Sequence, residues 1–217
     1  MDLSDRFFLS DIKILKAAKQ HFAIVDPVMS ALTVFVGEID LPKRSADFDS
    51  LTRIIIGQQI SRKAADAIIK RIRDASFSNT SLSPSDIFAL DTEGLKVCGL
   101  SGPKASYILG VAELLVTRPD FLDEIMRLPL DMAYSELIQI KGIGPWSAKN
   151  FLLFSLRAFD VFPDGDLALD KGLGKLYCGI QEGMNVSWEG IVKKWSPYRG
   201  IAALYLWEWS RRGMPSF

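Results

Sequence analysis

The residue types best suited to chemistry lie between positions 137 and 169, where a glycine-rich turn is followed by an acidic turn. The first turn places Gly142 and Gly144 directly before an apolar run at 147–159 that has helical spacing. Glycines permit positive φ and close approach to a ligand, and amide groups at a helix N-terminus attract anions. The pattern predicts a phosphate site made of main-chain groups, although a glycine pair between helices also serves as a simple tight turn.

The acidic turn ends in Asp164, Gly165 and Asp166 and precedes another helical run. Asp166 stands at or near a helix start, where amide donors and the helix dipole favour the ionised carboxylate. A carboxylate held there has two uses: it caps the helix, or it stabilises positive charge that develops on a nearby reactant. The local sequence leaves both uses open.

Helical patterns dominate the elements that must position these turns, and we expect an all-α protein. Apolar residues recur at helical spacing from 48 to 73, which predicts one long helix. Shorter helices are predicted at 85–90, 92–97, 102–117, 121–127 and 131–139. Residues 33–36 form the single β-like candidate.

Composition limits the classes of function. The chain has 26 basic and 26 acidic residues, so its zero net charge gives no compositional sign of nucleic-acid binding. Cys98 and Cys178 are too few for a four-cysteine iron–sulfur cluster, and His21 is the sole histidine, so no transition-metal site is expected. No run is long and apolar enough to span a membrane, and the start lacks a signal-peptide profile. We expect a soluble intracellular monomer, in the cytoplasm of a prokaryote or the nucleus of a eukaryote.

Four segments in the same order resemble the HhH-GPD superfamily of DNA glycosylases, in its 3-methyladenine DNA glycosylase II branch. Residues 137–148 are similar to the helix-hairpin-helix, and residues 160–169 to the Gly/Pro-rich loop that ends in the catalytic aspartate. Residues 53–61 resemble the segment that carries the DNA wedge, and residues 195–207 resemble the C-terminal helix. The resemblance covers roughly residues 40–210.

The resemblance implies an all-α fold of two helical lobes, with the helix-hairpin-helix (about 137–149) at the cleft between them. One lobe would combine residues 1–46 with 159–217, and the other would span 47–158. The segment before the wedge is too short for the additional β-rich N-terminal domain of some bacterial relatives.

The resemblance assigns catalysis to Asp166, whose carboxylate would stabilise the positive sugar formed when a C1′–N bond breaks and would help position or deprotonate a water. Bifunctional relatives carry a nucleophilic lysine two positions after the second hairpin glycine, where this chain has Trp146. Lys149, about one helical turn away, is not assumed to replace it. The expected reaction is therefore hydrolytic base excision that leaves an abasic site without strand cleavage.

Trp146 and Trp207 are predicted to line the base pocket, because an indole gains a cation–π contribution from a positively charged alkylated purine. Trp207 also fits an ordinary buried position on an apolar helix. Asn150 departs from the tyrosine found there in one bacterial branch, so the outline of the pocket differs. Gln59 takes the position of the wedge residue that fills the duplex after base flipping, and Gln58 is a second wedge candidate or organises the same turn.

The expected partner is double-stranded DNA that contains alkylated bases. Contacts to its backbone are predicted for five hairpin residues: Lys141, Gly142, Ile143, Gly144 and Ser147. No cofactor is expected to be required, but hairpins of this family often hold Na+ or K+ through main-chain carbonyls, here those of Ile138, Ile140 and Ile143.

Two other functions fit parts of the pattern. A damage-binding protein with the same fold and little excision activity would keep the hairpin, but Asp166 and the two candidate pocket tryptophans favour an enzyme. An oxidised-base glycosylase with lyase activity is disfavoured by Trp146 at the lysine position.

Overall fold

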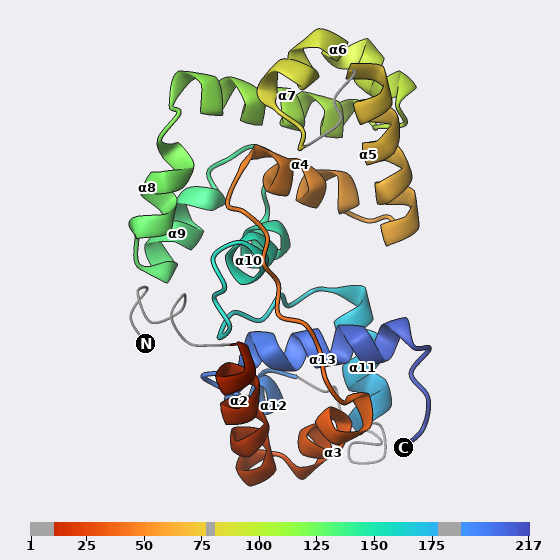
Figure 1. Cartoon of the computed structure of the whole chain (residues 1–217), viewed down its shortest axis with the longest axis vertical. Helices are drawn as coiled ribbons and strands as arrows, with labels where there is room; N and C mark the ends of the chain where they lie inside the picture. The colour runs from red at the N-terminus through yellow and green to blue at the C-terminus, as the bar shows by residue number, and fades with distance from the viewer. Residues whose placement is uncertain (1–10, 77–80, 178–187) are drawn as a thin grey trace. The chain divides into compact units, whose positions relative to one another are not determined.

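The computed structural model describes residues 11–76, 81–177 and 188–217 (Figure 1). All regular structure in these ranges is helical, which confirms the predicted all-α class. The chain divides into two compact units. Unit 1 combines the residues up to Lys43 with those from Arg157 onward, and unit 2 spans Arg44 to Leu156.

The described helices of unit 1 are α2 (Asp11–Val25), α3 (Pro27–Val36), α11 (Leu167–Tyr177), α12 (Glu189–Lys194) and α13 (Arg199–Arg211). Helix α13 packs against α3 and α11 (Figure 1). Its residues Ala202, Tyr205, Leu206 and Trp209 are buried at helical spacing, so they form the apolar stripe of an amphipathic helix. Trp207 lies off this stripe and is half-buried.

A buried carboxylate ties the parts of unit 1 together. Asp26 accepts the N–H groups of Val28 and Met29 at the start of α3, and its second oxygen accepts the Tyr177 hydroxyl at 2.7 Å and the Trp195 indole N–H at 2.8 Å. Burial and this neighbouring carboxylate raise the pKa of Tyr177. These four hydrogen bonds offset the free-energy cost of burying the Asp26 carboxylate in the core.

The β-like prediction for residues 33–36 was wrong, because these residues form the last turn of α3. Asp26 caps that helix and Pro27 occupies its first turn, which is a favoured combination for starting a helix. Burial of Leu32 and Val36 then favours continuing the helix through β-branched residues.

The described helices of unit 2 are α4 (Phe48–Gly57), α5 (Arg62–Ser76), α6 (Pro84–Val97), α7 (Gly102–Thr117), α8 (Phe121–Arg127), α9 (Leu130–Leu137) and α10 (Pro145–Phe154). Helix α4 is central, because it packs against α5, α7 and α10. Leu51, Ile55 and Ile56 of α4 are fully buried. Because α4 ends at Gly57 and packs against α10, it places the turn after residue 57 near the hairpin that precedes α10.

The single helix predicted over residues 48–73 was wrong, because α4 ends at Gly57 and α5 begins at Arg62. Gln59 in the intervening turn has φ 58°, and Ser61 caps α5 by accepting the N–H of Ala64. The apolar faces of α4 and α5 both contribute to the core, so helical spacing alone does not reveal the break. None of the described helices combines the length and apolar character needed to cross a membrane.

Candidate functional site

The glycine-rich turn is a tight hairpin between α9 and α10. The N–H of Ile143 donates to the carbonyl of Ile140 at 2.9 Å, and the buried Ile143 side chain anchors the turn. Gly144 is the N-cap of α10 in an extended conformation, and no side chain caps this helix. An uncapped helix N-terminus of this kind suits a phosphate, as the sequence predicts.

Gly142 is required by its backbone conformation and by its surroundings. Its φ is 93°, and a Cβ atom at this position would lie 2.4 Å from Cγ of Tyr107. The ring of Tyr107, on α7, therefore packs against the bare backbone of the hairpin. At Gly144, by contrast, a Cβ atom would meet nothing within 4 Å.

Gln58 connects the α4–α5 turn to the hairpin. Its amide nitrogen lies 2.8 Å from the carbonyl oxygen of Gly142 and 2.9 Å from Oγ of Ser147. Ser147 is only 2% exposed as a whole residue, so it presents almost no surface for the predicted contact with DNA. The Gln58 amide nitrogen is thus engaged within the protein, whereas Gln59 and Lys141 are exposed.

Lys104 is a functional candidate that the sequence reasoning missed. Its ammonium group donates to the carbonyls of Ile56 at 2.8 Å and Gln58 at 2.6 Å, at the C-terminal end of α4. The available signal was its place in the first turn of α7, where a positive charge opposes the helix dipole.

The acidic turn places Asp166 at the start of α11. Its Oδ1 accepts the N–H groups of Ala168 at 2.9 Å and Leu169 at 3.0 Å, so the carboxylate caps the helix. The same oxygen accepts the indole N–H of Trp207 at 3.1 Å. The capping contacts fix the carboxylate in place, and capping is therefore compatible with a chemical role for Asp166.

Two further carboxylates lie near Asp166. Asp170 is one helical turn along α11, and burial together with the charges of Asp166 and Asp164 raises the pKa of Asp170. The start of α11 therefore brings three carboxylates close together, and their negative charge favours a positive charge that develops nearby.

The residues around Trp146 occupy distinct positions on α10. Trp146 is half-buried, and its carbonyl accepts the amide N–H of the buried Asn150 at 2.8 Å. The ammonium group of Lys149 lies 6.0 Å from the ring centroid of Tyr134. Asn150 and Lys149 thus both have contacts within unit 2.

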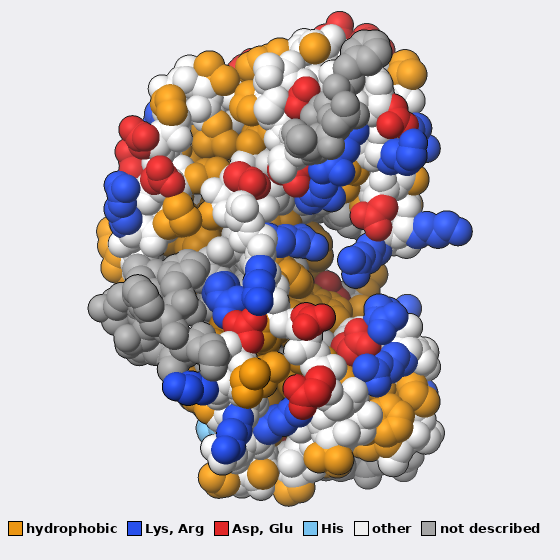
Figure 2. Space-filling view, viewed as in Figure 1, with side chains coloured by type: hydrophobic (Ala, Val, Ile, Leu, Met, Phe, Trp, Pro, Cys, Tyr) orange, Lys and Arg blue, Asp and Glu red, His pale blue; other side chains and the backbone are white. Residues whose placement is uncertain are grey.

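The described residues contain no cluster of three His, Cys, Asp or Glu side chains suited to a metal ion. His21 contacts the carbonyl of Lys194 at 3.0 Å and the rings of Phe22 and Tyr198, so it acts in packing. Cys98 is buried and unpaired, and Cys178 lies outside the described residues. Figure 2 shows basic and acidic side chains interspersed over the face drawn, in agreement with the zero net charge.

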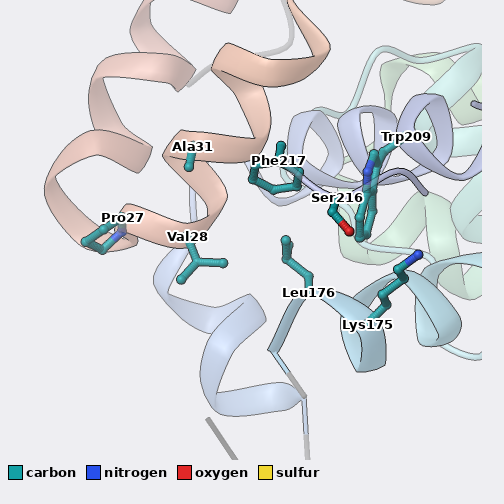
Figure 3. Close-up of a pocket in the computed structure, with 8 residues that line it drawn as sticks. All are labelled: Pro27, Val28, Ala31, Lys175, Leu176, Trp209, Ser216 and Phe217. Carbon is teal, nitrogen blue, oxygen red and sulfur yellow. The ribbon is translucent and has the colours of Figure 1, made fainter. Parts of the chain in front are cut away.

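An apolar groove of about 460 Å³ lies elsewhere in unit 1 (Figure 3). Its lining consists of Pro27, Val28, Ala31, Lys175, Leu176, Trp209, Ser216 and Phe217. Lys175 and Leu176 belong to the C-terminal end of α11, whereas Asp166 precedes its N-terminal end. The groove is therefore separated from the Asp166 carboxylate by the length of this helix.

Known proteins match most of the chain. DNA-3-methyladenine glycosylase 1 of Schizosaccharomyces pombe is 31% identical over 210 residues, which cover 91% of this chain and 88% of that protein. A solved structure of 3-methyladenine DNA glycosylase from the same species, in complex with abasic DNA, superposes with a TM-score of 0.80 at 28% identity. The match covers 93% of this chain and all of that chain (100%).

A bacterial structure gives a similar result. DNA-3-methyladenine glycosidase from Bacillus halodurans has a TM-score of 0.69 and 31% identity, with 88% of each chain covered. The family model described as "HhH-GPD superfamily base excision DNA repair protein" matches residues 52–195, a stretch that contains residues 53–61, the hairpin and Asp166. This chain therefore belongs to the HhH-GPD superfamily of base excision DNA repair proteins.

Proposed function

We propose that this protein is a DNA glycosylase that hydrolyses the N-glycosidic bond of alkylated purines, including 3-methyladenine, and leaves an abasic site. The observation that carries the proposal is the Asp166 carboxylate, held by two amide groups and the Trp207 indole at the position of the family's catalytic aspartate. The relatives named as 3-methyladenine glycosylases favour this enzyme over a non-catalytic damage-binding protein.

In the proposed reaction, the C1′–N bond breaks and its electron pair leaves with the base. Asp166 stabilises the positive sugar through its fixed negative charge, and Asp164 and Asp170 add to the local negative potential. A water molecule forms the new O–C1′ bond and loses its proton to Asp166 or to solvent. An N-alkylated purine is already a good leaving group, so selectivity arises from its lability and from the ease of flipping.

The proposed glycosylase is monofunctional. Trp146 has no amine that could form a Schiff base at the position of the catalytic lysine. Lys149, on the same helix, is oriented over Tyr134. The indole of Trp146 instead offers a half-buried aromatic wall for a flipped base, and the half-buried Trp207 donates its indole N–H to Asp166.

The proposed substrate is double-stranded DNA with an alkylated base, bound by a monomer inside the cell. Main-chain N–H groups of the hairpin, including those of Gly142 and Gly144, contact a phosphate, and Gln59 enters the duplex beside the lesion. The proposal includes Na+ or K+ at the hairpin, held by the carbonyls of Ile138, Ile140 and Ile143. It is supported by the Ile140 carbonyl, which accepts one N–H and retains a second lone pair. Such an ion would add positive charge beside the phosphate.

Base release tests the proposed activity. Purified protein is incubated with methylated duplex DNA, and the released bases are separated and quantified. Wild type should release 3-methyladenine, whereas Asp166→Asn should reduce the rate by about a hundredfold to a thousandfold, because the substitution removes the charge that stabilises the transition state. Asp166→Asn should still bind abasic DNA with nearly the wild-type Kd. Near wild-type release by this variant would refute the assignment of Asp166.

Borohydride trapping tests the monofunctional mechanism. Reduction of a Schiff base would leave a covalent protein–DNA adduct, and we expect none with wild type. An adduct would show that an amine of this chain attacks C1′, and substitution of Lys149 would then identify whether that lysine supplies it.

A further inference from the structure

The turn between α4 and α5 holds Gln59 in a backbone conformation that a glutamine disfavours. Gln59 has φ 58°, and its side chain is exposed. A left-handed conformation is costly for a residue other than glycine and persists only where the surrounding structure imposes it. The contacts of its neighbours therefore determine the direction in which the proposed wedge points.

Lys104 supplies the first of these contacts. Its ammonium group donates to the carbonyls of Ile56 and Gln58, on the residues that lead into Gln59. The position is unfavourable for a lysine in two ways: it lies in the first turn of α7, and burial lowers the pKa of Lys104. The two carbonyls at the negative C-terminal end of α4 offset these costs, so this lysine serves the α4–α5 turn rather than its own helix.

The second contact runs from the turn to the hairpin. The side chain of Gln58 donates to the carbonyl of Gly142 and contacts the Ser147 hydroxyl. Tyr107 lies one turn beyond Lys104 on α7 and packs against Gly142. Helix α7 thus contacts the wedge turn through Lys104 and the hairpin through Tyr107.

We propose that Lys104 is a positioning residue for the wedge Gln59 and that Gln58 couples this wedge to the hairpin. The inference rests on the proposed DNA contacts of these two segments. Helix α7 fixes the distance between the amide groups that bind a phosphate and the side chain that enters the duplex. A protein preorganised in this way inserts its wedge without first ordering the turn.

Binding to an abasic site that cannot react isolates this role from catalysis. The probe is a duplex with a tetrahydrofuran abasic-site analogue, and its Kd is compared with that of the intact duplex of the same sequence. Lys104→Met keeps the apolar stem and removes the ammonium group. We expect the preference for the abasic duplex to fall about tenfold, the effect of losing charge-assisted hydrogen bonds, with little change for intact DNA.

Two variants control for general effects. Lys104→Arg retains a positive donor and should restore most of the abasic preference. Lys70→Met removes an exposed lysine of α5 that pairs with Asp74 and should leave the preference unchanged. An unchanged preference in folded Lys104→Met would overturn the inference.

A double-mutant cycle tests whether Lys104 acts through Gln59. In the Gln59→Ala background, Lys104→Met should cause no further loss of abasic preference. If the double variant instead loses abasic preference by the product of the two single-variant factors, Lys104 acts independently of the wedge. That result would also overturn the inference. A wild-type protein without any abasic preference would do the same.

Gln58→Glu tests the coupling from the hairpin side and serves if Lys104→Met does not fold. A glutamate cannot donate to the Gly142 carbonyl when ionised, so the abasic preference should again fall, and an unchanged preference would refute the coupling. Base release by wild type is measured separately. If wild type releases no base but the variants still lose their abasic preference, the proposed enzyme activity is refuted. The positioning roles of Lys104 and Gln58 would still stand.

Discussion

The two units position their functional groups by different means. In unit 1, one oxygen of Asp166 accepts two amide N–H groups and the Trp207 indole N–H, so the side chain proposed to act in catalysis is itself held. In unit 2, the groups proposed to meet DNA are main-chain amides and one exposed glutamine. Other residues of unit 2 hold them in place: Lys104 donates to the α4–α5 turn, Gln58 donates to the hairpin, and Tyr107 packs against Gly142.

This difference predicts where substitutions should act. Changing a contact of Asp166 alters the group proposed to stabilise the transition state, so the effect should be on the rate of excision. Changing a residue that supports the hairpin or the proposed wedge alters the geometry of the groups proposed to bind DNA. The effect should therefore be on affinity and on the preference for damaged sites. The following substitutions probe each side of that division.

Trp207→Phe should have the largest effect in this set. Phenylalanine keeps an aromatic ring but removes the N–H that Asp166 accepts, so the single-turnover rate of base release should fall about tenfold to a hundredfold. The Kd for abasic DNA should stay within about twofold of wild type, because the proposed phosphate contacts lie on the hairpin. The rate is measured with excess enzyme on methylated DNA.

Trp209→Phe is the matched control on the same helix. It also removes an indole N–H, but this one donates to the carbonyl of Pro215. Its effect should therefore appear in thermal stability and not in the rate of base release. Equal rates for the two variants would contradict the positioning of Asp166 by Trp207.

Gly142→Ala should disrupt the hairpin, whereas Gly144→Ala should be tolerated better. The first adds a methyl group 2.4 Å from the Tyr107 ring at a φ of 93°, so the free energy of unfolding should fall by about 1–3 kcal/mol. DNA affinity should fall with it. Urea unfolding and DNA titration of both variants check this, and equal losses would show that the Tyr107 contact is unimportant.

Asp170→Asn should have the smallest effect in this set. Unlike most substitutions, it should raise the free energy of unfolding. Burial and neighbouring carboxylates raise the pKa of Asp170 above its ordinary 3.8, so its ionised form destabilises the folded state. The stability that the neutral carboxyl confers is complete below pH 3.8 and is lost as pH rises through the folded pKa. At pH 7 the free energy of unfolding of the variant should therefore exceed that of wild type, by less than about 1 kcal/mol.

The pH dependence of this gain is its test. The difference in free energy of unfolding between Asp170→Asn and wild type should disappear below pH 3.8. There the carboxyl of Asp170 is protonated in both the folded and the unfolded state. Chemical unfolding at pH 7 and pH 3 measures this difference. Lower stability of the variant at pH 7 would show that a favourable partner of Asp170 outweighs the repulsion.

Local signals predicted several elements well. The helices Gly102–Thr117 and Phe121–Arg127 have the predicted bounds, because polar residues, Pro and Gly mark their ends within a few positions. The break after Gly57 was missed because both flanking helices bury apolar residues. Residues 33–36 were misjudged because β-branched residues favour strands only where a helix has not already begun.

The sequence by itself determined which groups are available. It placed Gly142 and Gly144 before a helix, Asp166 at the start of another, and Trp146 where bifunctional relatives have lysine. These are local properties, because turn geometry, capping and residue type are set within a few positions. They were sufficient to identify the superfamily, and they support the proposal that Asp166 is the catalytic carboxylate.

Only the tertiary structure decided what holds these groups. The donor from Trp207 to Asp166 spans 41 positions, that from Lys104 to Gln58 spans 46, and that from Gln58 to Ser147 spans 89. Helical spacing gives the face on which a side chain lies but not the helix that packs against that face. The supports of the carboxylate and the wedge therefore emerge only when the helices of each unit are packed.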